Sequence, residues 1–248
     1  MSINRSLALM LLSALAGASM AGQASADNLI QNSGFATAAP QSQVIEGAYA
    51  PTYGVFTPTT VTNWSANGVY DLIVYPGQGD NTSILKNGFA LYGPANGSAN
   101  GLTATGPGGG NYVALDGDFP GNFSQTIGGL VTGKQYTLSF YFAGAQEINA
   151  SGATTEQLQV SLGDQVFNTE TLNTPNAGFS PWRQESFTFT YDGAGDVLSF
   201  LATGNGVPPY ALINDPTLVG APGPVPGAGV AGLAALALIG LYARTRRA

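Results

Sequence analysis

The chain has 248 residues, of which only 8% are charged, and it contains neither histidine nor cysteine. The lack of cysteine excludes disulfides, and the lack of histidine removes the usual zinc ligand, proton shuttle and base of a Ser-His-Asp triad. Between residues 27 and 219, three basic residues stand against 14 acidic ones, a net charge of −11. Such a surface repels phosphate backbones, so we expect no nucleic-acid partner.

Residues 1–26 have the composition of a secretory signal peptide. Arg5 precedes a short apolar run, and the segment ends in Ala24-Ser25-Ala26, the small-x-small pattern that signal peptidase accepts. A first transmembrane helix is the alternative, but the apolar run is short and is interrupted by glycine and serine. We therefore expect cleavage after Ala26 and export across the inner membrane.

The segment at 27–219 predicts one all-β domain. With 35 glycines, 15 prolines and few charges, the chain favours short strands and turns over amphipathic helices. In Tyr136–Phe142, apolar and polar residues alternate, as in a strand that buries one face. The clearest predicted strands are Tyr112–Leu115, Phe123–Ile127, Tyr136–Phe142, Gln157–Leu162, Ser186–Tyr191 and Val197–Leu201.

The order of the short motifs in this segment carries a family resemblance. Asn28–Phe35 is similar to an opening strand, Gly109–Gly117 to the next shared stretch, Gly129–Phe140 to a central strand and Tyr210–Asp215 to a closing strand. Together they resemble carbohydrate-binding modules with the galactose-binding-like jelly roll. The resemblance implies an antiparallel β-sandwich, and a polysaccharide or cell-surface glycan as the partner.

Aromatic residues before Gly109 are candidates for sugar contact, because sugars stack on aromatic rings and such domains carry binding groups on loops. The candidate ligand-binding tyrosines are Tyr70, Tyr75 and Tyr92. Trp64 and Trp182 are interpreted as core residues instead.

The turn at 116–122 offers oxygen ligands of the kind that calcium prefers. Asp116 and Asp118 are therefore candidates for ligand or calcium binding, although an aspartate-rich hairpin turn is the simpler interpretation and the one that we favour. The jelly-roll resemblance adds Asp215 as a structural calcium ligand. The same two aspartates are the nearest approach to a glycosidase pair, yet their spacing favours a turn, so we expect no enzymatic activity.

The C-terminal tail has three parts: a Pro/Gly linker at 220–227, an uncharged run at 228–243 and a basic tail at 244–248. As a helix, the uncharged run would span about 24 Å, and arginine snorkelling would close the small gap to the bilayer thickness. We therefore expect a transmembrane helix with its C-terminus in the cytoplasm. The residues on which this expectation depends are Pro222, Pro224, Pro226, Arg244, Arg246 and Arg247.

This succession resembles the PEP-CTERM sorting signals of Gram-negative bacteria, with Pro-Gly-Pro in place of the Pro-Glu-Pro that names the family. The resemblance implies processing by an exosortase-type membrane peptidase and delivery to the cell envelope or extracellular matrix. A permanent C-terminal anchor is the alternative. The sequence thus predicts an exported, non-catalytic carbohydrate-binding protein, with a purely structural or adhesive matrix protein as the alternative.

Overall fold

The computed structural model describes residues 27–36, 44–45, 61–68, 70–82, 90–206 and 208–221. The described residues belong to one compact unit, Asp27–Ala221. The predicted signal peptide, the linker, the C-terminal apolar run and the basic tail lie outside them. Within the described ranges, no helix has the length and apolar character needed to span a membrane.

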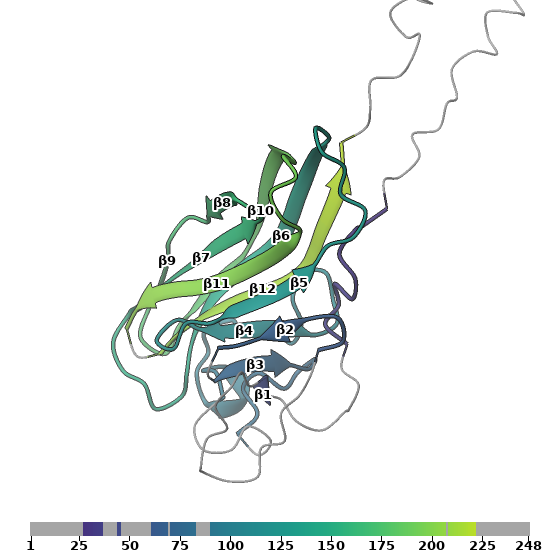
Figure 1. Ribbon diagram of the computed structural model, residues 1–248. Coiled ribbons are helices and arrows are strands. Elements are labelled where there is room, and N and C mark those ends of the chain that lie inside the picture. The colour runs from purple at the N-terminus through teal and green to yellow at the C-terminus, as the bar shows by residue number, and fades with distance from the viewer. Residues whose placement is uncertain are drawn as a thin grey trace, which may run out of the picture. The chain divides into compact units, whose positions relative to one another are not determined.

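Two antiparallel sheets make up the domain, and Figure 1 shows them as two layers. Sheet I has the order β1-β3-β4-β12-β6-β10, and sheet II has the order β2-β5-β11-β7-β8, with β9 also paired to β7. The strands of sheet I are β1 (Val44–Ile45), β3 (Asp71–Val74), β4 (Tyr112–Asp116), β12 (Pro209–Gly220), β6 (Gln135–Gln146) and β10 (Phe179–Thr190). Those of sheet II are β2 (Ser65–Ala66), β5 (Asn122–Thr126), β11 (Val197–Asn205), β7 (Thr154–Leu162), β8 (Gln165–Asn168) and β9 (Leu172–Thr174).

The predicted strands are confirmed, and several are longer than the sequence pattern indicates. The alternation in β6 places Leu138 and Phe140 in the core and leaves Thr137 and Ser139 on the outer face, half-buried. The only helix in the described ranges is a single 3-10 turn at Pro94–Asn96. The expectation of an all-β domain is therefore confirmed for these residues.

A continuous apolar core lies between the sheets. It includes Phe35, Trp64, Phe123, Phe140 and Phe200, with Trp64 stacked on Phe123 at a ring-centroid distance of 4.5 Å. A second apolar layer covers the other face of sheet I and includes Leu91, Leu102, Tyr112, Tyr210 and Leu212, with Trp182 packed against it. Sheet I is thus buried on both faces over part of its area.

The expected opening strand is wrong in one respect, because Asn28–Phe35 forms turns rather than a strand. Among the described residues, its one backbone–backbone hydrogen bond to β12 runs from the Leu29 N–H to Leu218 O, at 2.9 Å. Asn32 and Phe35 have positive φ angles of 53°, which interrupt an extended chain. The segment is instead attached through the Asn28 side chain, whose Oδ1 accepts from the Leu218 N–H at 2.8 Å.

Candidate functional site

A polar groove lies at the edge of sheet II where β2 pairs with β5. Its volume is about 450 Å³, and it is lined by Gln31, Asn63, Trp64, Ser65, Ser124, Gln125, Thr126 and Val197. No charged side chain lines this groove. Its lining consists mainly of amides and hydroxyls, which can both donate and accept hydrogen bonds.

Gln125 positions the two walls of the groove. Its side chain is buried, and Oε1 accepts a hydrogen bond from the Gln31 N–H at 2.8 Å. Nε2 donates to Gln31 O at 2.8 Å and to Asn63 O at 3.0 Å. Because one amide bonds both segments, residues that are far apart in the sequence are held at fixed positions on either side of β5.

The floor of the groove comes from strand register. Ser65 lies opposite Ser124, and Val197 lies opposite Thr126. Phe123 and Ile127 on the same strand point into the core, so the alternation of β5 turns Ser124 and Thr126 outward. Among the described residues, none bonds to the side-chain groups of Asn63, Ser65, Ser124 or Thr126. These groups are available to a ligand.

Trp64 closes one wall but offers little ring surface. Its side chain is 7% exposed, and its indole N–H donates to Asn32 O at 3.2 Å. The prediction that Trp64 is a core residue is confirmed. Trp182 differs: it is only partly buried, lies outside the sandwich core, and donates from Nε1 to Thr103 Oγ1 at 2.9 Å.

Three of the predicted ligand residues gather at one end of sheet I rather than in the groove. The ring of Tyr70 meets that of Phe119 edge to face at 5.2 Å, and Tyr70 O accepts from the Tyr210 hydroxyl at 3.1 Å. Asp116 Oδ1 accepts from the Asp118 N–H at 2.8 Å. This bond is the local turn contact expected of an aspartate-rich hairpin.

The other two tyrosines have structural contacts. Tyr75 packs against the sandwich core, and the Tyr92 hydroxyl donates to Ala150 O at 3.2 Å. Neither residue lines the groove. None of the five predicted ligand residues therefore belongs to it.

The end of sheet I also holds buried carboxyl groups that the sequence did not single out. Asp71 is 1% exposed; its Oδ1 accepts from the Asp116 N–H at 3.0 Å, and its Oδ2 has no hydrogen-bond partner. Burial raises the pKa of Asp71 well above its ordinary value, and that of Asp116 to about 6. Burial, with the nearby charge of Asp116, raises the pKa of Glu147 to about 8. Asp116 and Glu147 therefore have pKa values close to neutral pH.

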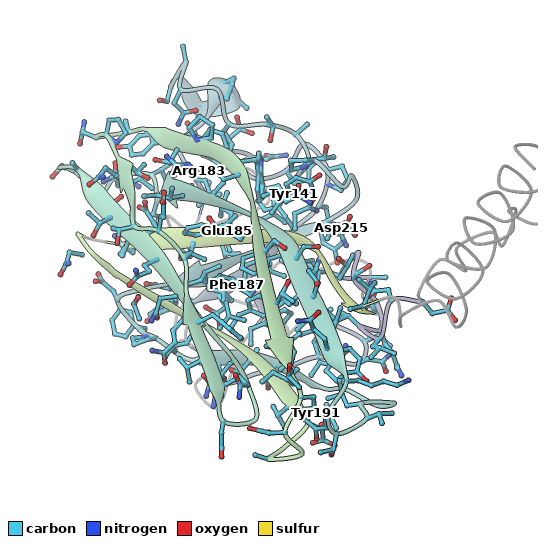
Figure 2. All side chains as sticks on the ribbon, turned by 90° about the horizontal axis from the view of Figure 1, so that it is seen from above. Tyr141, Arg183, Glu185, Phe187, Tyr191 and Asp215 are labelled. Atoms are coloured by element: carbon cyan, nitrogen blue, oxygen red, sulfur yellow. The ribbon has the colours of Figure 1, made fainter. Side chains whose placement is uncertain are left out.

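Asp215 lies apart from these carboxyl groups. It follows Tyr210, the strand partner of Asp116, by five positions along β12, a separation of roughly 16 Å at the usual strand rise. It occupies a bulge of β12 with φ 48° and lies beside Tyr141 (Figure 2). Asp116, Asp118 and Asp215 therefore do not surround one point, and the described ranges contain no group of three acidic residues arranged to hold a metal ion.

No motif in the sequence points directly to the groove. Gln31, Ser65 and Ser124 are ordinary polar residues, and only the pairing of β2 with β5 and the bonds of Gln125 bring them together. Alternation in Phe123–Ile127 could have predicted that Ser124 and Thr126 face outward. It could not have predicted which segment would form the opposite wall.

Comparison with known proteins does not define a family for the domain. No family model matches the sequence, and no curated protein matches it. One similar solved structure is TmCBM61 in complex with β-1,4-galactotriose, with 13% identity over 64% of this chain and 90% of that one and a TM-score of 0.37. Another is the CBM22-1 xylan-binding domain of Paenibacillus barcinonensis Xyn10C, with 10% identity over 81% and 98% of the two chains and a TM-score of 0.36.

A third similar structure is the enzymatically active domain of bacteriophage CBA120 tailspike protein 4, with 12% identity over 65% of this chain and 20% of that one and a TM-score of 0.33. These similar structures thus include both binding modules and an enzyme. Function has to be argued from the groove and its chemistry.

Proposed function

We propose that the domain binds a neutral polysaccharide or cell-surface glycan, without catalysis, through the groove at the β2–β5 edge. The observation that carries this proposal is the lining of the groove, which offers hydroxyl and amide groups and no charge. A neutral sugar presents hydroxyls that both donate and accept, and such a lining can pair with them. A phosphate or carboxylate ligand would find no cation here.

The geometry favours modest affinity. Each hydrogen bond exchanged with water contributes about 0.5–1.5 kcal/mol, and little of the Trp64 ring is exposed for stacking. A few such bonds correspond to a dissociation constant of roughly micromolar to millimolar. Tight binding of a polysaccharide would then come from repeated contacts along one chain or from several copies of the protein.

A glycan array with purified protein tests the proposal, with β-1,4-galactotriose and xylohexaose among the probes because similar structures are named for binding galactotriose and xylan. We expect saturable binding to a neutral glycan that Gln31→Ala or Ser124→Val weakens. Gln184→Ala is the matched control, because Gln184 is an exposed amide on sheet I. No binding by folded protein across neutral glycans would overturn the proposal.

We also propose, from the sequence alone, that the chain is exported and sorted to the cell envelope or matrix by its two terminal segments. The Ala24-Ser25-Ala26 pattern and the arginine-ended apolar tail support this. Mass spectrometry of the protein from its native host provides the test. A mature N-terminus at Asp27 and a C-terminus near Pro226 support export with processing; an intact Ala248 supports a permanent anchor instead, and retention of Met1 contradicts export through a cleaved signal.

A further inference from the structure

A row of serines crosses sheet II. Ser65 on β2 is the strand partner of Ser124 on β5, which is the partner of Ser199 on β11, which in turn is the partner of Ser161 on β7. Four neighbouring strands therefore each place a serine at the same level. Adjacent strands lie about 4.8 Å apart, so the row extends roughly 14 Å from Ser65 to Ser161.

The row lies on the outer face of the sheet. The residues next to it in register, Phe123, Phe200 and Val160, are fully buried in the core between the sheets. Since side chains alternate along a strand, the serines point the opposite way. Figure 1 shows β5, β11 and β7 side by side as one layer, and their order agrees with the strand pairing.

This outer face carries no charge on its paired strand positions. A second row beside the serines consists of Asn122, Leu201, Gln159 and Asn168 on β5, β11, β7 and β8. Further positions in the same alternation are Thr126, Val197, Thr203, Gln157, Asn205, Thr155 and Asn173. In a domain with a net charge of −11, the paired outer positions of sheet II are thus uncharged and mostly polar, with Leu201, Val197 and Val166 as apolar members.

The corresponding hydroxyls of sheet I behave differently. There, Thr137 and Thr188 bond to each other at 3.0 Å, and Ser139 bonds to Thr217 at 2.8 Å. On sheet II, the side-chain hydroxyls of Ser65, Ser124 and Ser161 form no hydrogen bond within the described ranges. Ser199 Oγ also lacks a partner, but it is buried. The hydroxyls of this row that are free for a ligand are therefore those of Ser65, Ser124 and Ser161.

The row is continuous with the groove, because Ser65 and Ser124 belong to both. We propose that the outer face of sheet II binds an internal stretch of an extended neutral polysaccharide, which runs from the groove across β5 and β11 toward β7. This inference rests on the proposed function and specifies its ligand as a chain rather than a terminal sugar. A pyranose is about as long as the ~4.8 Å strand spacing, so successive sugars meet successive strands.

A chain-length series of soluble probes tests the inference. Calorimetry with di-, tri-, tetra- and hexasaccharides of the xylo- and β-1,4-galacto-series should show affinity that rises with length. Ser161→Ala and Gln159→Ala, which lie away from the groove, should weaken hexasaccharide binding by about three- to tenfold each and leave disaccharide binding unchanged. Ser186→Ala, an exposed serine on sheet I, is the matched control.

A second variant keeps the test informative if single hydroxyls contribute little. Ser161→Glu places a charge in the neutral face and should reduce hexasaccharide affinity further, with far-UV circular dichroism confirming the fold. Equal affinity for di- and hexasaccharides, with sensitivity confined to Gln31 and Ser124, would overturn the extended surface and leave the groove proposal standing. Failure of every oligosaccharide to bind would overturn both.

Discussion

Glu156 is a buried residue whose hydrogen bonds indicate the protonation state of its carboxyl group. Its Oε1 is bonded by the Thr154 hydroxyl at 2.5 Å, and its Oε2 lies 2.5 Å from Thr174 Oγ1. Thr174 Oγ1 also lies 3.0 Å from Ser180 Oγ, whose own proton is donated to Asn173 O at 2.8 Å. One Thr174 proton cannot serve both bonds, so all four exist together only if the carboxyl carries a proton.

Burial raises the pKa of Glu156 to about 7, while the hydroxyls of Thr154 and Thr174 act to lower it. The native state thus favours the neutral acid, and its stabilisation is fully present below the ordinary pKa of 4.5 and is lost as the pH rises to about 7. Glu156→Gln imitates the neutral acid. We expect it to stabilise the protein at pH 8 by up to about 3 kcal/mol and to have little effect at pH 4.

Urea unfolding of the wild type and of Glu156→Gln across this pH range measures the difference. Glu170→Gln is the control, because Glu170 is 83% exposed and its ion pair with Arg183 contributes little at the surface. If the stability of Glu156→Gln depended on pH as that of the wild type does, the carboxyl group of Glu156 would not be protonated in the native state.

Gly121 is a second residue whose identity is fixed by its surroundings. A Cβ at this position would lie 2.1 Å from the backbone of Gly68, so the turns at the ends of β2 and β5 touch backbone to backbone. Gly121→Ala should destabilise the domain by about 1–3 kcal/mol, because neither backbone can yield as a flexible side chain would. Gly128→Ala, with open space around its Cβ, is the matched control, and equal thermal unfolding of the two variants would show that the close approach is unimportant.

At the scale of elements, Gln125 connects β5 to the segments that carry Gln31 and Asn63. Replacing it with leucine keeps the volume similar and removes three hydrogen bonds, leaving three backbone groups unpaired. We expect a loss of roughly 3 kcal/mol in stability and faster amide exchange in residues 28–36 and 61–65. Glycan affinity should fall further than in Gln31→Ala, since both walls lose their support. Unchanged exchange in these segments would show that Gln125 does not hold them.

Strand alternation explains which elements could be predicted from sequence. Tyr136–Phe142 alternates cleanly, and β6 forms there with the predicted face buried. Asn28–Phe35 is expected to be an opening strand only by its family resemblance, yet two left-handed residues and the Asn28 side chain turn it into a series of turns along β12. A resemblance in motif order does not determine whether a segment enters the sheet, because that depends on the edge available to it.

The candidate site was harder to predict than the fold, for a physical reason. Tyr70, Asp116 and Asp118 are predicted as ligand-binding residues because of their residue types, and the structure does bring them together. The groove is formed instead by ordinary polar residues, which only the strand register brings together. A serine next to Phe123 is ordinary in sequence; it becomes part of the proposed binding surface because three other strands place serines at the same level.

For the molecule as a whole, the described residues include several buried carboxyl groups but no buried basic side chain to neutralise their charge. In the described ranges the basic side chains are Lys134 and Arg183, and both are exposed. Asp71, Asp116 and Glu147 all have raised pKa values because of burial; the charge of Asp116 adds to the effect on Asp71 and Glu147, and that of Asp118 adds to the effect on Asp116. Their pKa values exceed those of the unfolded chain, so the contribution of these three groups to stability is greatest at low pH, where all are protonated, and declines as the pH rises toward 8.

Asp71→Asn isolates this contribution. The amide oxygen can still accept from the Asp116 N–H, while the buried charge that Asp71 acquires at high pH disappears. We expect the variant to unfold at higher urea than the wild type at pH 8 and at similar urea at pH 4. Because Asp71 lies in sheet I and Glu156 in sheet II, the two replacements should add. A wild type that gains stability from pH 4 to pH 8 would show that these carboxyl groups are charged in the native state.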